Sequence, residues 1–300
     1  QEGSRMKGFL RKSANPIMGK GNKVLVLMLR VLRSSPKLVA GVAIVSIVIA
    51  IGLLAPIITW YPPLKTLVGQ PFTPPNPRYP FGTDDLGRDI YSNTIYGIRT
   101  SLLVGALSTI IAMIIGLTIG AIAGYYSRLL GEILMRITDM AFIIPSFLLA
   151  LLIATILGPS IQNIMIAIGV TSWPGIARMV RAEFLRVKEQ AFIEVARAIG
   201  VSDRRIILRH IMPNAIVTVI PYIVLQMSSN ILAEAGLSFL GVGDPNVPSL
   251  GKLLNTAQQY LATSWWIATF PGLVLSIIII GFNLLGDGLI DYMNPRSRTG

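Results

Sequence analysis

The sequence predicts an all-α integral membrane protein, and two observations lead to this fold class. Hydrophobic residues make up 53% of the 300 positions and charged residues only 13%, with a mean hydropathy of +0.66. Soluble domains typically contain about 25% charged residues. The apolar residues are also gathered into runs of roughly 20, which is the length that an α-helix needs to cross a bilayer.

We expect six transmembrane helices. Their approximate ranges are 38–60, 101–125, 133–157, 161–179, 215–237 and 265–285. A shorter apolar segment, Val24–Leu32, has arginines beside it and is expected to form an interfacial helix in the headgroup plane. The chain thus divides into an N-terminal leader (1–37), a transmembrane domain (38–290) with a large loop at 183–213, and a tail (291–300).

Basic residues predict the orientation of these helices. Of the 26 lysines and arginines, 21 fall on one side of the expected spans. The positive-inside rule then places both termini and the 183–213 loop in the cytoplasm. The net charge of +12 would suggest nucleic-acid binding in a soluble protein, but here its distribution serves orientation. We therefore expect contact with membrane lipid and no nucleic-acid partner.

Motifs for catalysis are missing from the sequence. It contains no cysteine, which excludes disulfides and thiolate metal sites. It also contains no Gly-x-x-x-x-Gly-Lys-Ser/Thr phosphate loop and no His-Glu-x-x-His motif. The single histidine, His210, lies among arginines without a partner for base catalysis. We expect a protein that is not an enzyme and binds no metal or cofactor itself.

The segment AFIEVARAIGVSDRRIILRHIMPN (191–214) is unusually charged for this chain. The pattern predicts a helix over about 186–199 that ends at Gly200 in a left-handed conformation. Ser202 is expected to cap a second helix, with Asp203 at its positive end, before Pro213 opens the fifth span. Two helices and a glycine corner would make a rigid protrusion.

Acidic residues elsewhere leave alternatives open. Asp84, Asp85 and Asp89, with Thr83, are expected to cap the first turn of an external helix that begins near Thr83. The alternative is that they bind a metal ion. Glu132, Arg136 and Asp139 share one face of the third span. Because charges are costly in a bilayer, they either neutralise one another locally or contribute to a pathway.

The fifth span has an unusually polar face for a helix in lipid. Gln226, Asn230 and Glu234 on this face are candidates for a translocation path or for contact with a partner subunit. In the second span, Gly116, Gly120 and Gly124 recur every four residues. That spacing predicts close packing against another helix.

The loop segment EVARAIGVSDRRIILRHIMP resembles the EAA loop of the permease subunits of ABC importers. Glu194, Ala196, Gly200 and Pro213 stand in register with that motif, whereas Val195, His210 and Met212 replace the usual Ala, Ile and Leu. The resemblance implies a cytoplasmic coupling helix that binds an ATPase subunit. The residues it implicates are Glu194, Val195, Ala196, Gly200, Val201, Ser202, Asp203 and Arg204.

Further blocks narrow the resemblance to one subfamily. FGTDDLGRDIYSNTIYGIRTSLLVG (81–105), SWWIATFPGLVL (264–275) and NLLGDGLIDYMNP (283–295) are similar to the second permease subunit of dipeptide, oligopeptide and nickel importers. Leu250 stands where that subfamily has Trp. The resemblance implies the type I permease fold in the cell membrane of a prokaryote.

The same resemblance implies partners and a substrate. The partners are a homologous permease, two cytoplasmic ATPase subunits that hold ATP and magnesium, and an extracytoplasmic solute-binding protein. That protein would meet external loops near 81–99 and 241–264. Short peptides are the expected solute, with nickel or oligosaccharides as alternatives. A different class of function, an ion-coupled secondary carrier, also remains open.

Overall fold

The computed structural model describes residues 35–126 and 129–293, where every regular element is helical. The expected interfacial helix at 24–32 and most of the tail lie outside these residues. The elements are α3 (Pro36–Ile58), α4 (Ile90–Tyr125), α5 (Leu129–Ile143), α6 (Ser146–Leu157), α7 (Ile161–Thr171), α8 (Trp173–Lys188), α9 (Ala191–Ala198), α10 (Asp203–Arg205), the π turn η1 (Ile206–Ile211), α11 (Met212–Phe239), α12 (Leu250–Ala257), the 3-10 turn η2 (Gln258–Tyr260) and α13 (Trp266–Met293).

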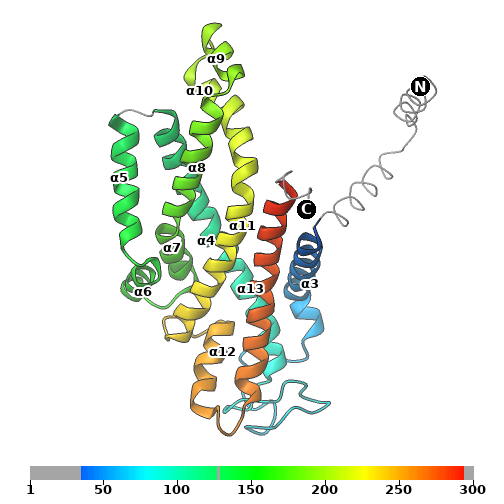
Figure 1. Cartoon of the computed structure of the whole chain (residues 1–300). Helices are drawn as coiled ribbons and strands as arrows, with labels where there is room; N and C mark the ends of the chain where they lie inside the picture. Colours follow the sequence, from blue (N-terminus) through cyan, green and yellow to red (C-terminus); the bar gives the residue numbers. More distant parts are fainter. Residues whose placement is uncertain (1–34, 127–128, 294–300) are drawn as a thin grey trace, which may run out of the picture.

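Long helices run side by side between two dissimilar ends of the molecule (Figure 1). At one end α9 and α10 protrude beyond the bundle, and the start of α3 and the end of α13 point the same way. Lys37 Nζ lies 3.2 Å from Asp291 Oδ2, so these two chain segments are paired there. The loop between α3 and α4 lies at the other end, together with α12. The start of α3, the end of α13 and the protrusion thus share one end of the molecule.

Four helical segments in the described ranges are long and apolar enough to cross a membrane: α3, α4, the run Asp203–Phe239, and α13. Helices α5 and α6 meet at an angle of 82°. If they form one broken span, the count is five. The third expected span, 133–157, is therefore not one continuous helix. Pro145 follows Ile144 at the bend, and proline disfavours helical geometry in the residue before it.

The fourth expected span is also interrupted. Helix α7 ends at Thr171, and α8 begins at Trp173 with Pro174 in its first turn. Proline suits a first turn but breaks the hydrogen bonding of a helix interior, so the two helices meet at Ser172 instead of forming one rod. Six membrane crossings stay a prediction, because only four or five helical segments of the described residues are long and apolar enough to cross a membrane.

The external acidic residues do not begin a helix near Thr83. Helix α4 starts at Ile90, and Asp89 is its N-cap, accepting from Ser92 N–H at 2.9 Å. Asp84 instead accepts from Arg88 Nε at 2.5 Å within a turn. Gly82 and Gly87 have φ of 75° and 66°, and these left-handed residues keep the segment out of a helix.

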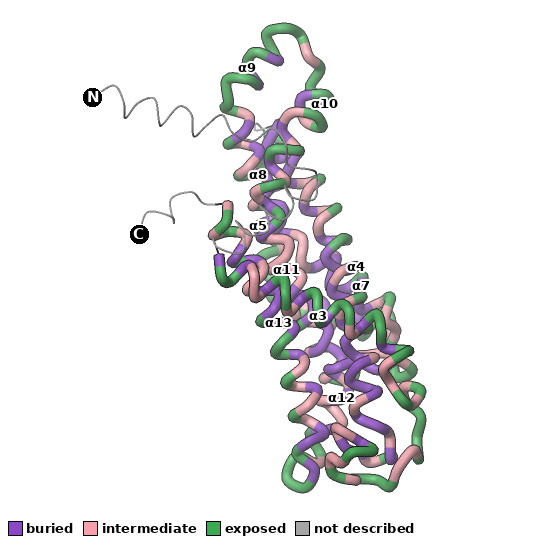
Figure 2. The backbone as a smooth tube through the Cα atoms, turned by 90° about the vertical axis from the view of Figure 1, so that its right-hand side faces the viewer, coloured by how far each residue is buried: buried purple, intermediate pink, exposed green. Residues whose placement is uncertain are grey.

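The glycine stripe of α4 packs against α8, as predicted. A Cβ at Gly120 would lie 2.5 Å from the carbonyl oxygen of Ala177, and one at Gly124 would lie 2.5 Å from Phe184 Cβ. Only glycine permits this approach of the two backbones. Buried residues continue along the inside of the bundle, whereas α9 and α10 are mostly exposed (Figure 2).

Candidate functional site

The protruding segment, residues 189–205, is called the elbow here. Its corner is Gly200, with φ of 79°. Gly200 N–H donates to Arg197 O and Val201 N–H donates to Ala196 O, each at 3.0 Å. These two bonds are the Schellman motif, which ends a helix on a left-handed residue. The predicted glycine corner is confirmed, but the predicted helix over 186–199 is not continuous, because α8 ends at Lys188 and the extended backbone of Gln190 precedes α9.

The second half of the elbow differs from expectation. Ser202 holds the N-cap position without a side-chain hydrogen bond, and its carbonyl accepts from Arg205 and Ile206 N–H at 2.9 and 3.0 Å. No separate second helix follows, because α10, η1 and α11 form one continuous run. Pro213 lacks an amide hydrogen, and the helix widens into the π turn before it instead of ending. The elbow is thus joined without a break to a spanning helix.

Helix α9 has two apolar faces. Ile193 and Ala196 are buried against the bundle. Three other large side chains, Phe192, Val195 and Ile199, are 46%, 60% and 74% exposed. Their spacing of three and four residues puts them on one side of the helix. We call these three residues the α9 stripe; exposed apolar residues gathered in this way make it a candidate interaction surface.

Only Val195 of the α9 stripe belongs to the residues that the sequence implicated, although the helical spacing could have shown the others. Of the remaining residues, Glu194, Gly200, Ser202 and Arg204 are exposed and Val201 is half-buried. Asp203 accepts a hydrogen bond from the Tyr125 hydroxyl. Nearby, burial lowers the pKa of Lys188, and the charge of Arg197 lowers it further.

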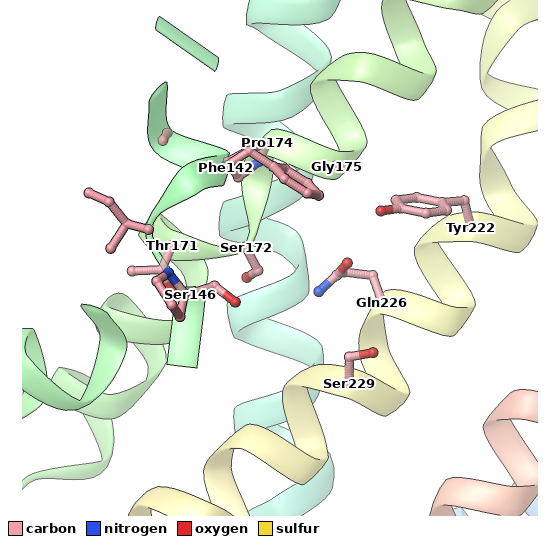
Figure 3. A pocket seen from close by; sticks show the side chains of 12 residues that line it. Phe142, Ser146, Thr171, Ser172, Pro174, Gly175, Tyr222, Gln226 and Ser229 are labelled. Carbon is pink, nitrogen blue, oxygen red and sulfur yellow. The ribbon is translucent and has the colours of Figure 1, made fainter. Parts of the chain in front are cut away.

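A second candidate site is a cleft between α11 and the broken helices. Two hollows of about 410 and 370 Å³ share Ser146, Thr171, Ser172, Gln226 and Ser229. Figure 3 shows Tyr222 and Gln226 extending from α11 toward Gly175 and Ser172. Among the described residues that line the two hollows, none is charged. The cleft therefore offers hydroxyl and amide groups beside apolar surface.

The cleft coincides with both helix breaks. Ile144 and Pro145 line it at the bend between α5 and α6, and Ser172 lines it between α7 and α8. At membrane depth, backbone that is not helical is tolerated where it is buried in protein or lines a water-filled cavity. Both breaks therefore lie where the backbone lines this cleft.

The three path candidates of the fifth span separate in the structure. Gln226 and Asn230 line the cleft, and Gln226 Nε2 donates to Asn230 Oδ1 at 3.0 Å. Glu234 lines neither hollow. It is 1% exposed and accepts from Ser101 Oγ at 2.7 Å and Ser238 Oγ at 2.8 Å.

The cleft contains two further residues of the same helix, and of these Tyr222 was not predicted from the sequence. Tyr222 and Ser229 lie four residues before and three after Gln226, so they share its face.

Asp139 also has an unexpected partner: Arg178 Nη2 of α8 donates to its Oδ1 at 2.7 Å. Asp139 is thus neutralised by a residue of another helix, because α5 packs beside α8.

Comparisons with known proteins agree with this arrangement. Residues 116–299 match the family described as binding-protein-dependent transport system inner membrane component. The dipeptide transport system permease protein of Alkalihalophilus pseudofirmus is 38% identical, covering 89% of this chain and 88% of the relative. The glutathione transport system permease protein of Escherichia coli is 40% identical over 75% of this chain and 74% of its own length.

Solved structures show the same fold. A chain of the MetNI methionine ABC transporter in an inward-facing conformation has a TM-score of 0.57 at 19% identity, covering 67% of this chain and 96% of that one. An amino acid ABC transporter gives 0.52 at 18% identity, covering 68% and 95%. The fold is that of type I ABC-importer permeases. The chain is a multi-pass membrane protein and belongs to the family of binding-protein-dependent transport system inner membrane components.

Proposed function

We propose that this chain is one of two homologous permease subunits of an ATP-driven importer of short peptides in a prokaryotic cell membrane. The observation that carries the proposal is the exposed α9 stripe on an elbow continuous with a spanning helix. Hydrolysis takes place on two separate ATPase subunits, which hold ATP and magnesium. This chain converts their motion into movement of its helices.

The elbow is the docking site for an ATPase subunit in this proposal. Phe192, Val195 and Ile199 lose water when they enter a cleft on that subunit, which is the favourable term for association. Glu194 and Arg204 are exposed on the same protrusion and supply charged contacts at its rim. The elbow then faces the cytoplasm, as the distribution of basic residues predicts.

The cleft is this chain's wall of the translocation path, and the second permease supplies the opposite wall. Gln226 and Asn230 contact the solute there, together with Tyr222 and Ser229. Glu234 supports the wall from behind, because its bond to Ser101 ties α11 to α4. Alternate opening of the path to the two sides follows from rocking of these helices.

Peptides are the proposed solute because of the relatives and the chemistry of the cleft. The relatives named above are permeases of dipeptide and glutathione transport systems. Uncharged hydroxyl and amide groups can hydrogen-bond to peptide groups whatever the charge of the side chains. Among the described residues, no group of three or more His, Cys, Asp or Glu side chains could hold a metal ion.

The solute-binding protein is proposed to dock at the end opposite the elbow. The α3–α4 loop and α12 form that end (Figure 1). Exposed apolar side chains are present there, including Leu67, Leu86 and Leu261. A partner that covers them would be stabilised by burial of their surface.

Reconstituted vesicles test the proposal. The chain, its partner permease, the ATPases and the binding protein are placed in proteoliposomes, and uptake of labelled dipeptide is measured with and without ATP. We expect uptake only when ATP, all subunits and the binding protein are present. Uptake by this chain alone under an ion gradient would instead establish a secondary carrier. The solute that raises the melting temperature of the binding protein identifies peptide, nickel or oligosaccharide as cargo.

A further inference from the structure

Tyr125, the last residue of α4, contacts the elbow through several groups. Its hydroxyl donates to the Asp203 carboxylate. Its ring faces two cations, Lys188 Nζ and the Arg197 guanidinium carbon, each 5.5 Å from the ring centroid. Lys188 Nζ also donates to the backbone carbonyl of Tyr125 at 2.6 Å. One side chain thus binds residues before, within and after α9.

The same tyrosine is packed into the base of the elbow. Tyr125 is 6% exposed and belongs to the apolar cluster that contains Phe184 and the inward residues Ile193 and Ala196. A hydrogen bond to a carboxylate is stronger than one between neutral groups, and partial burial strengthens it further. The end of α4 is therefore held to the elbow by both apolar packing and charged contacts.

Helix α4 also contacts a residue that lines the cleft. Thr109 of this helix accepts a hydrogen bond from Asn230 Nδ2 at 2.9 Å. Asn230 belongs to α11 and lines the cleft. Ser101 donates to Glu234 one turn further along α11. A contiguous set of contacts therefore runs from the elbow through α4 to the cleft wall, which is the kind of network through which two distant sites can be coupled.

We propose that Tyr125 is a positioning residue that makes α4 move with the elbow, so that α4 transmits ATPase motion to the wall of the cleft. This inference rests on the proposed function, because it takes the elbow as the ATPase docking site. Covalent continuity already links the elbow to α8 and α11. Helix α4 is distant from the elbow in sequence, and Tyr125 with its bond to Asp203 supplies the link that the chain itself lacks.

The test is Tyr125→Phe in the complete reconstituted importer. Phenylalanine keeps the ring that packs and faces the cations, and it removes only the donor to Asp203. We expect the ATPases to bind the elbow and to hydrolyse ATP as before. The amount of dipeptide taken up per ATP hydrolysed should fall about ten-fold, which corresponds to the loss of one hydrogen bond to a charged group. Tyr126→Phe, at the neighbouring 44% exposed tyrosine, is the matched control and should leave this ratio unchanged.

A double variant separates a shared bond from two independent effects. Asp203→Ala removes the acceptor, so Tyr125→Phe with Asp203→Ala should lower the ratio no further than the worse single variant. Additive losses, an unchanged ratio in Tyr125→Phe, or a loss explained by weaker ATPase binding would each overturn the inference. Failure of the wild-type complex to couple uptake to ATP would instead overturn the proposed function.

Discussion

At the scale of residues, α9 shows how adjacent positions take opposite roles. Val195 is 60% exposed, whereas its neighbour Ala196 is buried against the bundle. The inward residues fix the position of the helix, and the outward residues remain available to a partner. The helical period decides which role each residue takes, since adjacent residues of a helix point in different directions.

Val195→Glu should therefore weaken ATPase binding without affecting membrane insertion. Placing a carboxylate in the centre of an apolar contact should lower affinity about ten-fold or more, because central interface residues commonly contribute at least this much. Pull-down of the ATPase with purified permease measures the effect. Leu129→Glu places the same charge at a 72% exposed apolar residue of α5, outside the elbow, and serves as control. Equal binding by Val195→Glu and wild type would contradict the docking assignment.

Ser229 provides a residue-level test of the path. Ser229→Phe fills part of the cleft with an aromatic ring, so uptake should slow several-fold while ATPase binding is preserved. Single-turnover uptake in proteoliposomes is the measurement. Ser276→Phe introduces the same ring at an exposed position of α13 outside the cleft and should transport normally. If both variants transport equally well, the solute passes elsewhere.

At the scale of elements, the close approach of their backbones explains how α4 and α8 stay together. In a bilayer, burial of apolar surface between helices contributes little to the free energy of association. Glycines on α4 let the backbones approach until van der Waals contacts become extensive. The broken helices pack differently. Their prolines prevent continuous rods, and the resulting bends create the cleft.

Gly120→Leu should disrupt the α4–α8 interface. Its side chain would meet the Ala177 carbonyl and Val180, and we expect the free energy of unfolding to fall by about 1–3 kcal/mol. Thermal unfolding of the purified chain in detergent reports the change. Thr118→Leu introduces an equal side chain on the exposed face of the same helix. A Gly120→Leu protein as stable as this control would show that the packing is looser than described.

At the scale of the whole molecule, the elbow and the α3–α4 loop occupy opposite ends (Figure 1). The proposed function requires this separation, because a cytoplasmic ATPase and an extracytoplasmic binding protein would contact opposite ends of the same chain. The helical bundle lies between these two ends.

The absence of cysteine makes the sidedness directly testable. Val195→Cys and Leu67→Cys each introduce a single thiol at exposed positions of the two ends. In right-side-out vesicles, a membrane-impermeant maleimide should label Leu67→Cys at once and Val195→Cys only after the vesicles are opened. The reverse pattern would place the elbow outside the cell and end the proposal of ATPase docking.

The sequence by itself determined the features that depend on solvent and near neighbours. Composition selects a bilayer, the spacing of Gly116, Gly120 and Gly124 selects a helix contact, and Gly200 supplies a left-handed corner. Each follows from the hydrophobic effect or from the conformational limits of one residue. The side of the membrane is predicted by the same kind of local information, the count of basic residues.

Only the tertiary structure decided which distant residues meet. Asp139 pairs with Arg178, 39 residues away, and Glu234 with Ser101, 133 residues away. The 82° bend and the cleft likewise depend on how α5 to α8 pack against α11. Proline can predict that a helix is interrupted, but the direction of the bend follows from neighbouring helices. Such contacts arise from the geometry of packing, which the spacing of residues along one helix does not contain.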